Sequence, residues 1–286
     1  MKRKGLTMAG RSRLTGLLFF SPWLVGFLAL TLYPLLYSVV IGFSEVRIKV
    51  TGTELRFLGL EHYAYALTRD ENFPIELLTS IAQIAAGLPI VLVFSLIVAL
   101  LLNRRFRGRA FFRAVFFLPV VIISGPVLTQ LVEETKAMQI TFDMGFLRYF
   151  SRGGGPGLAP IMQQLVRTLW FSGVQTLIFL AALQKIDHSI YEAASIDGAT
   201  GWEMFWRITL PYVKPTILLN AIYTVVEMGA VSSDPTNVRI MDHLLEVGRP
   251  YSYSAAMAWI FALLQLAIIL IAFLLLRQRR GKGERA

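Results

Sequence analysis

One polar segment stands between two hydrophobic runs of this chain, and its sequence is Glu192-Ala-Ala-Ser-Ile-Asp-Gly198-Ala-Thr-Gly-Trp-Glu-Met-Phe205-Trp-Arg-Ile208-Thr-Leu210-Pro211. Ser189-Ile-Tyr-Glu192 and Thr200-Gly-Trp-Glu203 both match the capping box, in which a hydroxyl and a carboxylate satisfy free N–H groups at a helix start. Gly198 between them can adopt the left-handed conformation that ends a helix. The segment therefore predicts a short helix, a sharp turn, and a second helix that runs through Pro211 into the next hydrophobic run.

The composition predicts an integral membrane protein. The 286 residues are 55% hydrophobic, with a mean hydropathy of +0.59, which is too apolar for a soluble domain of this length. A bilayer crossing needs about 20 apolar residues. Six runs meet this need, and they are 14–44, 77–103, 114–132, 157–184 (with Arg167), 208–233 (with Lys214 and Glu227) and 250–276. We therefore expect an all-α fold of six transmembrane helices.

The positive charges predict the orientation of these helices. Fifteen of the 28 Lys and Arg residues lie in three short stretches, 2–13, 104–113 and 277–285, which fall on one side of a six-span model. Positive residues are retained on the cytoplasmic side. We therefore expect a multi-pass protein of the cell membrane with both termini in the cytoplasm. The loops expected outside, 45–76, 133–156 and 234–249, carry both signs of charge.

Several other classes of protein are disfavoured by the sequence. The net charge of +10 is confined to the membrane-flanking stretches, so it indicates contact with anionic lipid rather than with nucleic acid. The chain contains no cysteine, which excludes disulfides and thiolate metal sites. The glycines of 151–157 do not form a phosphate loop, because no Gly-x-x-x-x-Gly-Lys-Ser/Thr occurs. Energy from ATP would have to come from a partner.

The polar segment resembles the EAA loop of binding-protein-dependent ABC importer permeases, in which Glu-Ala-Ala is followed by Gly and then by Ile-x-Leu-Pro. The resemblance implies the transmembrane domain of a type I importer, with a cytoplasmic coupling helix that docks into a groove on the ATPase. It assigns the coupling role to eight residues: Glu192, Ala193, Ala194, Asp197, Gly198, Ile208, Leu210 and Pro211. The structural alternative is an ordinary amphipathic helix at the membrane surface.

Three more segments resemble the carbohydrate branch of this family, and the resemblance covers most of residues 14–276. They are 30–38 in the first span, 57–63 in the first outer segment, and 107–119 at the start of the third span. The basic tail resembles that of the first of the two permeases in maltose- and oligosaccharide-type importers. Ser232-Ser-Asp234-Pro235 departs from the Gly-Gly-Pro turn of many relatives, which weakens analogy in substrate.

The resemblance implies four partners and no cofactor in this chain. The partners are a second homologous permease, two copies of a cytoplasmic ABC ATPase that hold ATP and magnesium, an extracytoplasmic solute-binding protein, and a carbohydrate. The chain is therefore expected to be a transport subunit and not an enzyme. The expected divisions are a basic N-terminus 1–13, a first helix 14–44, an outer segment 45–76, a core 77–276 with the coupling loop at 187–211, and a basic tail 277–286.

Six residues are candidates for the substrate pathway: Trp170, Val174, Gln175, Thr224, Glu227 and Met228. A carboxylate within a span is costly and usually faces a cavity or a charge, so Glu227 either lines a pocket or reaches the outer headgroups. Trp170 either stacks on a sugar or belongs to the interfacial aromatic belt. Thr224 and Met228 lie near Glu227 on the same helix.

Two rival functions stay open from the sequence. The first is an importer permease for another solute, such as glycerol phosphate, a polyamine or a peptide. The second is a membrane-embedded glycosyl or phosphatidyl transferase, which would need clustered acids or histidines at the membrane face. The acids on the expected cytoplasmic face belong mainly to the coupling segment, so the sequence favours a carbohydrate importer permease.

Overall fold

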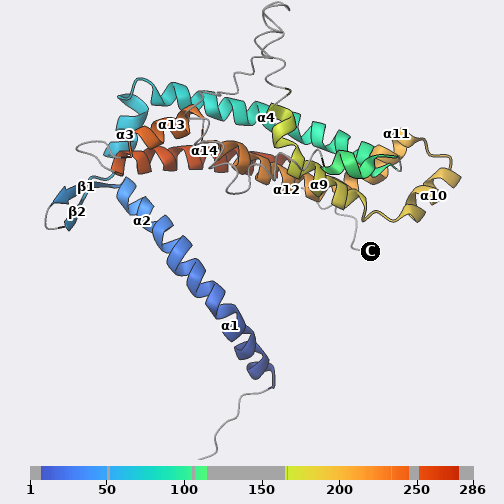
Figure 1. Ribbon diagram of the computed structural model, residues 1–286, viewed down its shortest axis with the longest axis horizontal. Helices are drawn as coiled ribbons and strands as arrows, with labels where there is room; N and C mark the ends of the chain where they lie inside the picture. Colours follow the sequence, from blue (N-terminus) through green and yellow to red (C-terminus); the bar gives the residue numbers. More distant parts are fainter. Residues whose placement is uncertain are drawn as a thin grey trace, which may run out of the picture. The chain divides into compact units, whose positions relative to one another are not determined.

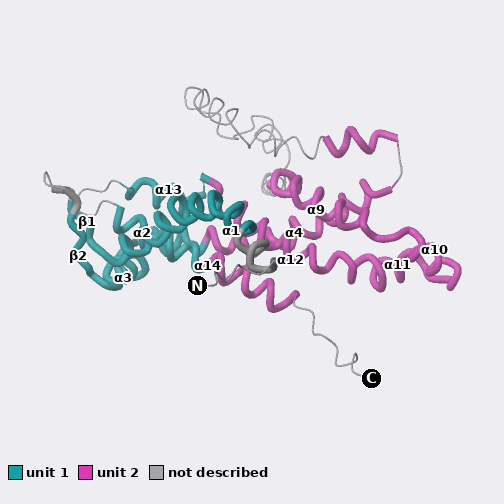
Figure 2. The backbone as a smooth tube through the Cα atoms, turned by 90° about the horizontal axis from the view of Figure 1, so that it is seen from below, with its two compact units in different colours: residues 1–78, 232–263 teal, residues 79–231, 264–286 magenta. Residues whose placement is uncertain are grey.

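The structure is a computed structural model, and it describes residues 8–49, 52–104, 107–114, 165, 167–232, 234–244 and 251–276. The described chain is mostly helical, with one two-stranded antiparallel sheet (Figure 1). It divides into two compact units, drawn in different colours in Figure 2. The first comprises residues 1–78 and 232–263, and the second comprises residues 79–231 and 264–286.

The first unit begins with one long helical run, α1 (Met8–Phe27), a π-helical turn η1 (Leu28–Leu32) and α2 (Tyr33–Gly42). Its apolar side chains are largely exposed, as expected of a helix that meets lipid. The π-helical turn ends two residues before Pro34, and proline has no N–H group for the helical ladder.

A β-hairpin follows in the segment expected outside the membrane. Strands β1 (Ser44–Lys49) and β2 (Gly52–Phe57) pair from Ser44 with Phe57 to Lys49 with Gly52. Glu45 lies opposite Arg56 and Arg47 opposite Glu54, so two opposite-charge pairs support the register. The sequence alone indicates only a polar outer segment here. In the structure the hairpin is followed by the short helix α3 (Glu61–Thr68).

The remaining elements of the first unit meet at a group of charged side chains, called here the Arg239 cluster. They are α13 (Pro235–Asp242) and the first parts of α4 (Phe73–Asn103) and α14 (Ser252–Leu276). Arg239 donates to both carboxylate oxygens of Glu76, and one of these bonds measures 2.9 Å. Asp70 accepts hydrogen bonds from Tyr253 Oη at 2.6 Å and from the Phe73 N–H at 2.9 Å. The cluster fastens α13 to the beginnings of both long helices.

The second unit is built on α4, α9 (Gly173–Leu183) and α12 (Leu210–Gly229), and α9 lies beside α12 (Figure 1). Buried apolar side chains from all three helices form one core cluster: Val98, Ala99, Leu102, Phe179, Leu180, Leu183, Ile186 and Val213. The loop between α9 and α12 holds α10 (His188–Ile196), α11 (Gly201–Met204) and a π-helical turn η2 (Phe205–Thr209). This loop is the segment for which the sequence predicted docking to the ATPase.

Three helical runs in the described residues are long and apolar enough to cross a membrane: Thr15–Gly42, Phe73–Asn103 and Ser252–Leu276. They correspond to the first, second and sixth predicted spans. The apolar helix α9 is shorter, and α12 carries Lys214 and Glu227. The third predicted span lies outside the described residues except for residue 114, so the number six stays a prediction.

Candidate coupling segment and polar cluster

The first helix of the coupling segment begins at Asp187, not at Ser189. Asp187 has extended backbone angles, and its Oδ1 atom accepts the Ser189 N–H at 3.0 Å. The predicted capping box at Ser189–Glu192 is therefore wrong. An aspartate two residues upstream caps the helix first, and aspartate is as good an N-cap as serine. The bonds from Ser189, its backbone N–H first and its hydroxyl second, hold the pKa of Asp187 below its ordinary value.

Glu192 consequently has a different contact from the one expected. Its Oε1 atom lies 3.0 Å from Nδ1 of His188, one helical turn earlier, and both side chains are exposed. The pair forms an i,i+4 contact on the helix surface, which stabilises a helix only slightly. Glu192 thus presents its carboxylate outward, where a partner protein can reach it.

Gly198 ends α10 as predicted. Its φ angle is +80°, a left-handed conformation that disfavours any side chain. The N–H of Ala199 donates to Ala194 O at 2.9 Å, and the N–H of Gly198 donates to Ser195 O at 3.1 Å. These two bonds define a Schellman motif, which satisfies the last carbonyls of the helix. The turn direction of the whole loop therefore depends on one glycine.

The second helix starts with the capping box that the sequence predicted. Thr200 Oγ1 accepts the Glu203 N–H at 3.3 Å, and Glu203 Oε2 accepts the Thr200 N–H at 2.9 Å. These bonds from Thr200, the backbone N–H first and the hydroxyl second, lower the pKa of Glu203. Glu203 therefore stays ionised and capping at neutral pH.

The two short helices are tied together by a hydrogen bond that the sequence did not suggest. Tyr191 of α10 and Thr209 of η2 share a hydrogen bond of 2.8 Å between their hydroxyl groups. Tyr191 also packs against the core cluster, as does Leu210 at the start of α12. The loop is thereby attached to the core cluster of the second unit.

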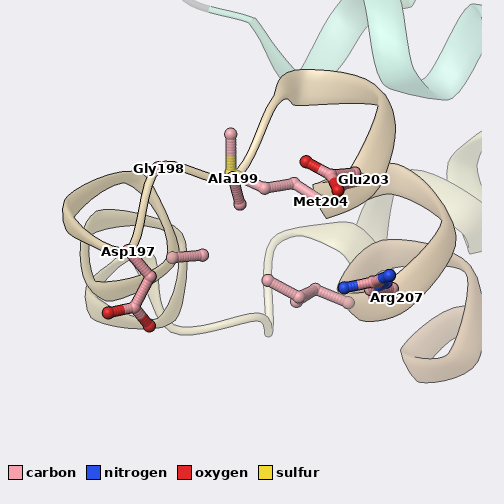
Figure 3. A pocket seen from close by; sticks show the side chains of 8 residues that line it. Asp197, Gly198, Ala199, Glu203, Met204 and Arg207 are labelled. Atoms are coloured by element: carbon pink, nitrogen blue, oxygen red, sulfur yellow. The ribbon is translucent and has the colours of Figure 1, made fainter.

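A cavity of about 360 Å³ lies between the two short helices. Figure 3 shows Asp197 and Gly198 on one side of it and Glu203, Met204 and Arg207 on the other. Four of the eight predicted coupling residues line it, namely Ala194, Asp197, Gly198 and Ile208. The other four do not: Glu192 and Ala193 are exposed on α10, Leu210 packs inward, and Pro211 is exposed on α12.

The same loop exposes large apolar side chains. Ile196 is 87% exposed and Trp202 is 70% exposed, and Trp206 stands one turn after Trp202 with their rings 5.5 Å apart. None of these three residues was among those predicted from the sequence to act in coupling. The loop therefore exposes large apolar side chains on both sides of the Schellman turn, and exposed apolar surface often marks a site that a partner covers.

A second set of predicted residues meets between α9 and α12. Gln175 Nε2 donates to Thr224 Oγ1 at 3.0 Å and to Glu227 Oε2 at 2.8 Å. Asn220, which was not predicted from the sequence, donates from its side-chain amide to the backbone carbonyl of Gln175 at 3.2 Å. Glu227 therefore turns toward α9. Gln175 and Thr224 are fully buried in this conformation, so a substrate could reach them only after these helices move apart.

The other three pathway candidates lie around this polar cluster. Met228 is buried against Gly87 of α4, where an added Cβ atom would approach its methyl group to 2.6 Å. Val174 and Trp170 are half-buried on and just before α9. Within the described residues, no group of three or more His, Asp or Glu side chains is placed to hold a metal ion.

The family assignment rests on a match of residues 71–279 to the model of the binding-protein-dependent transport system inner membrane component. This match covers most of the chain and includes the coupling loop and both helices of the polar cluster. The chain belongs to this family. It is therefore a membrane protein and the permease component of an ABC transport system.

Individual relatives agree with this assignment. The permease is 28% identical to the probable ABC transporter permease protein YesP of Bacillus subtilis, over 92% of this chain and 90% of the relative. It is 31% identical to the arabinooligosaccharides transport system permease protein AraP of Halalkalibacterium halodurans, over 71% of this chain and 64% of the relative.

The fold has a counterpart of known structure. A chain in the crystal structure of a bacterial alginate ABC transporter, in complex with a pentasaccharide-bound periplasmic protein, aligns with a TM-score of 0.61 at 21% identity. The alignment covers 93% of this chain and 95% of that one. The predicted type I transmembrane fold is thereby confirmed, with the β-hairpin as an addition to its helices.

Proposed function

We propose that this chain is the membrane subunit of an ATP-driven importer for a carbohydrate, most simply an oligosaccharide. The AraP relative is named for arabinooligosaccharide transport, which supports this substrate class. The proposed complex contains a second homologous permease, two copies of a cytoplasmic ATPase that bind ATP and magnesium, and an extracytoplasmic binding protein. This chain moves the sugar without changing it, so catalysis belongs to the ATPase.

The observation that carries the proposal is the geometry of the coupling loop. The Schellman turn at Gly198 joins α10 to α11, and Ile196 before it and Trp202 after it are exposed. Exposed apolar side chains on two short, capped helices can insert into a groove on a partner protein. Closure of the ATPase dimer on ATP then pushes α10, and the Tyr191–Thr209 bond passes this displacement to α12.

The polar cluster supports a gated pathway for a hydroxylated solute. In this conformation the Gln175 amide group donates hydrogen bonds to both Thr224 and Glu227. If α9 and α12 separate during alternating access, the same donors and acceptors become available to sugar hydroxyl groups. We propose Trp170, Val174 and Met228 as the apolar wall beside them. The orientation that fits this cycle has both termini in the cytoplasm and α10 on the cytoplasmic side.

A reconstituted complex tests the proposal. The chain would be purified with its second permease and ATPase, placed in vesicles, and supplied with binding protein and labelled oligosaccharide. Wild-type vesicles should accumulate sugar only with ATP. Ala194→Trp should abolish ATPase co-purification and uptake, because the new ring occupies the cavity between α10 and α11.

Ala64→Trp is the matched control, since Ala64 is an exposed alanine of α3 in the first unit. This variant should retain the ATPase at wild-type stoichiometry. If Ala194→Trp also co-purifies with the ATPase and hydrolyses ATP with normal stimulation, the loop is not the coupling element and the proposal fails.

A further inference from the structure

A second charged residue of the predicted spans, Arg167, has no role in the proposal so far. It lies in the fourth predicted span, six residues before the start of α9, and its Nη1 atom donates to Gln83 Oε1 of α4 at 2.6 Å. Its guanidinium also lies over the Phe171 ring, 5.9 Å from the centroid. An arginine within a membrane span is costly and usually faces a bundle interior or a water-filled cavity. Arg167 therefore marks a polar surface.

The contacts of Arg167 leave most of its hydrogen-bonding capacity unused. A guanidinium has five N–H donors, and in the described part of the chain the bond to Gln83 is its one hydrogen bond. Gln83 is exposed, and the residue three positions further along the same face of α4 is the small, exposed Ala86. The pair therefore stands at an open surface with space beside it. Facing lipid, the free donors would have no acceptor.

Free, preoriented guanidinium donors match one type of ligand group best. A carboxylate accepts two parallel N–H bonds from arginine, and a neutral hydroxyl cannot form this paired contact. The bond to Gln83 and the contact with Phe171 hold the guanidinium in one orientation, so less entropy is lost on binding. Trp170 lies three residues further along, within the same helical turn, and is half-buried.

We propose that Arg167 and Gln83 form a carboxylate-binding subsite in the translocation pathway, and that the transported oligosaccharide is acidic, with uronic acid units. This inference rests on the proposed importer function and specifies its substrate class. Gln175 lies eight residues beyond Arg167, or about 12 Å along a helix. A chain of several sugars spans this length, with a carboxylate at Arg167 and hydroxyl groups at the Gln175–Glu227 cluster.

The test uses the complete reconstituted importer and two probes with the same sugar backbone, one charged and one neutral. One is a trigalacturonate, and the other is its methyl ester, in which each carboxylate is neutralised. The affinity of the binding protein for each probe is measured separately, and uptake is compared at equal occupancy. Wild-type vesicles should import the acid faster than the ester. Arg167→Gln should lower uptake of the acid by about tenfold or more, while uptake of the ester changes less than about twofold.

Two further variants separate charge from geometry and from a general loss of positive charge. Arg167→Lys keeps the charge without the planar fork, so it should restore part of the acid uptake. Lys214→Gln is the matched control, because it also removes one positive charge from a membrane helix of the second unit. Its acid-to-ester ratio should equal that of the wild type.

The other outcomes overturn either the subsite or the importer function, and they can be told apart. If wild-type vesicles import neutral oligosaccharides but not the trigalacturonate, or import acid and ester equally, the importer function stands and the subsite is wrong. If Arg167→Gln loses both probes equally or fails to assemble, Arg167 is structural. If the Arg167→Gln variant keeps normal uptake of both probes and differs only in purifying without anionic lipid, the guanidinium binds a lipid headgroup phosphate. Absence of ATP-driven uptake for every sugar contradicts the importer function itself.

Discussion

At the scale of single residues, Gly198 shows how a backbone angle can control coupling. Its φ angle is +80°, and an added Cβ atom would meet nothing within 4 Å. The cost of substitution is therefore backbone strain, about 1–2 kcal/mol for residues that avoid the left-handed region, and not collision. The residue is required for its conformation and not for its small size.

This distinction predicts an order of effects. Gly198→Asn should keep most ATPase stimulation, because asparagine tolerates the left-handed region, whereas Gly198→Ala should lose more and Gly198→Val most. Substrate-stimulated ATP hydrolysis in vesicles measures the series. An order that follows side-chain volume alone, with Gly198→Ala milder than Gly198→Asn, would mean that a partner groove and not strain sets the requirement.

Glu227 allows a second residue-scale prediction. Glu227→Ala removes an acceptor from the buried Gln175 Nε2 group, while Glu227→Gln keeps an acceptor and removes the charge. We expect Glu227→Ala to lower uptake at limiting sugar and to leave assembly intact, and Glu227→Gln to retain more uptake. Wild-type uptake by the alanine variant would instead favour a carboxylate that only reaches the outer headgroups.

Site residues could be identified from the sequence where their hydrogen bonds join residues that are close together in the chain. Gly198 and the Thr200–Glu203 box were predictable, since their hydrogen bonds join residues at most five positions apart. The Tyr191–Thr209 bond spans a turn whose direction the sequence does not specify. Gln175, Thr224 and Glu227 were selected singly as polar residues in apolar spans, but their mutual contact depends on how α9 packs on α12.

At the scale of elements, the start of α10 gives a direct comparison of two caps. Asp187→Ala should destabilise α10 by about 1 kcal/mol, because the Ser189 N–H loses its acceptor. Ser189→Ala should have little effect. Hydrogen exchange of the α10 amides measures the effect of both substitutions. A larger loss of protection in Ser189→Ala than in Asp187→Ala would favour the Ser189–Glu192 capping box over the Asp187 cap.

The β-hairpin shows why a helical membrane protein can conceal strands from sequence analysis. Residues 44–57 mix charged and apolar side chains, so they indicate only a polar outer segment when hydrophobic spans dominate the chain. The strand register becomes evident from the pairs Glu45 with Arg56 and Arg47 with Glu54. Val46, whose N–H donates to Ser252 Oγ at 2.9 Å, anchors the hairpin to α14 within the first unit.

The Arg239 cluster, formed by Asp70, Glu76, Arg239 and Tyr253 in the first unit, predicts a dependence of stability on pH. Burial raises the pKa of Asp70, but hydrogen bonds from Tyr253, Phe73 and Asn72 and the charge of Arg239 outweigh this and hold it below the ordinary 3.8. A lowered folded-state pKa adds stability that is present above the unfolded-state pKa and is lost as pH falls through the folded-state value. Wild-type protein in detergent should therefore lose its thermal-stability advantage over Asp70→Asn as the pH falls below about 3.8.

Tyr253→Phe provides an independent measure of the same cluster. It removes the 2.6 Å bond to Asp70 and should lower stability at neutral pH by roughly 1.5–3 kcal/mol, the usual range for a hydrogen bond to a charged group. At a pH where Asp70 is protonated, the difference from wild type should shrink. If the stability difference between wild type and Tyr253→Phe stays constant over this pH range, the tyrosine contact does not depend on the ionisation of Asp70.

At the scale of the whole molecule, the order of helices along the chain constrains the topology. The basic stretch 104–113 at the end of α4 and the coupling loop at α10 are both predicted to lie in the cytoplasm. The chain between them must then cross the membrane an even number of times. The predicted spans 114–132 and 157–184 satisfy this condition, and the described part of the second of them leads directly into α9.

This parity makes the topology testable one loop at a time. A reporter that is active only outside should work when inserted within 45–76, 133–156 and 234–249, and it should be silent at 189–203 and after residue 277. The loop 133–156 is the most informative position, because its exposure outside requires the span 114–132. Silence at 133–156 together with activity at residue 195 would invert α9, place the coupling loop outside the cell, and separate it from any cytoplasmic ATPase.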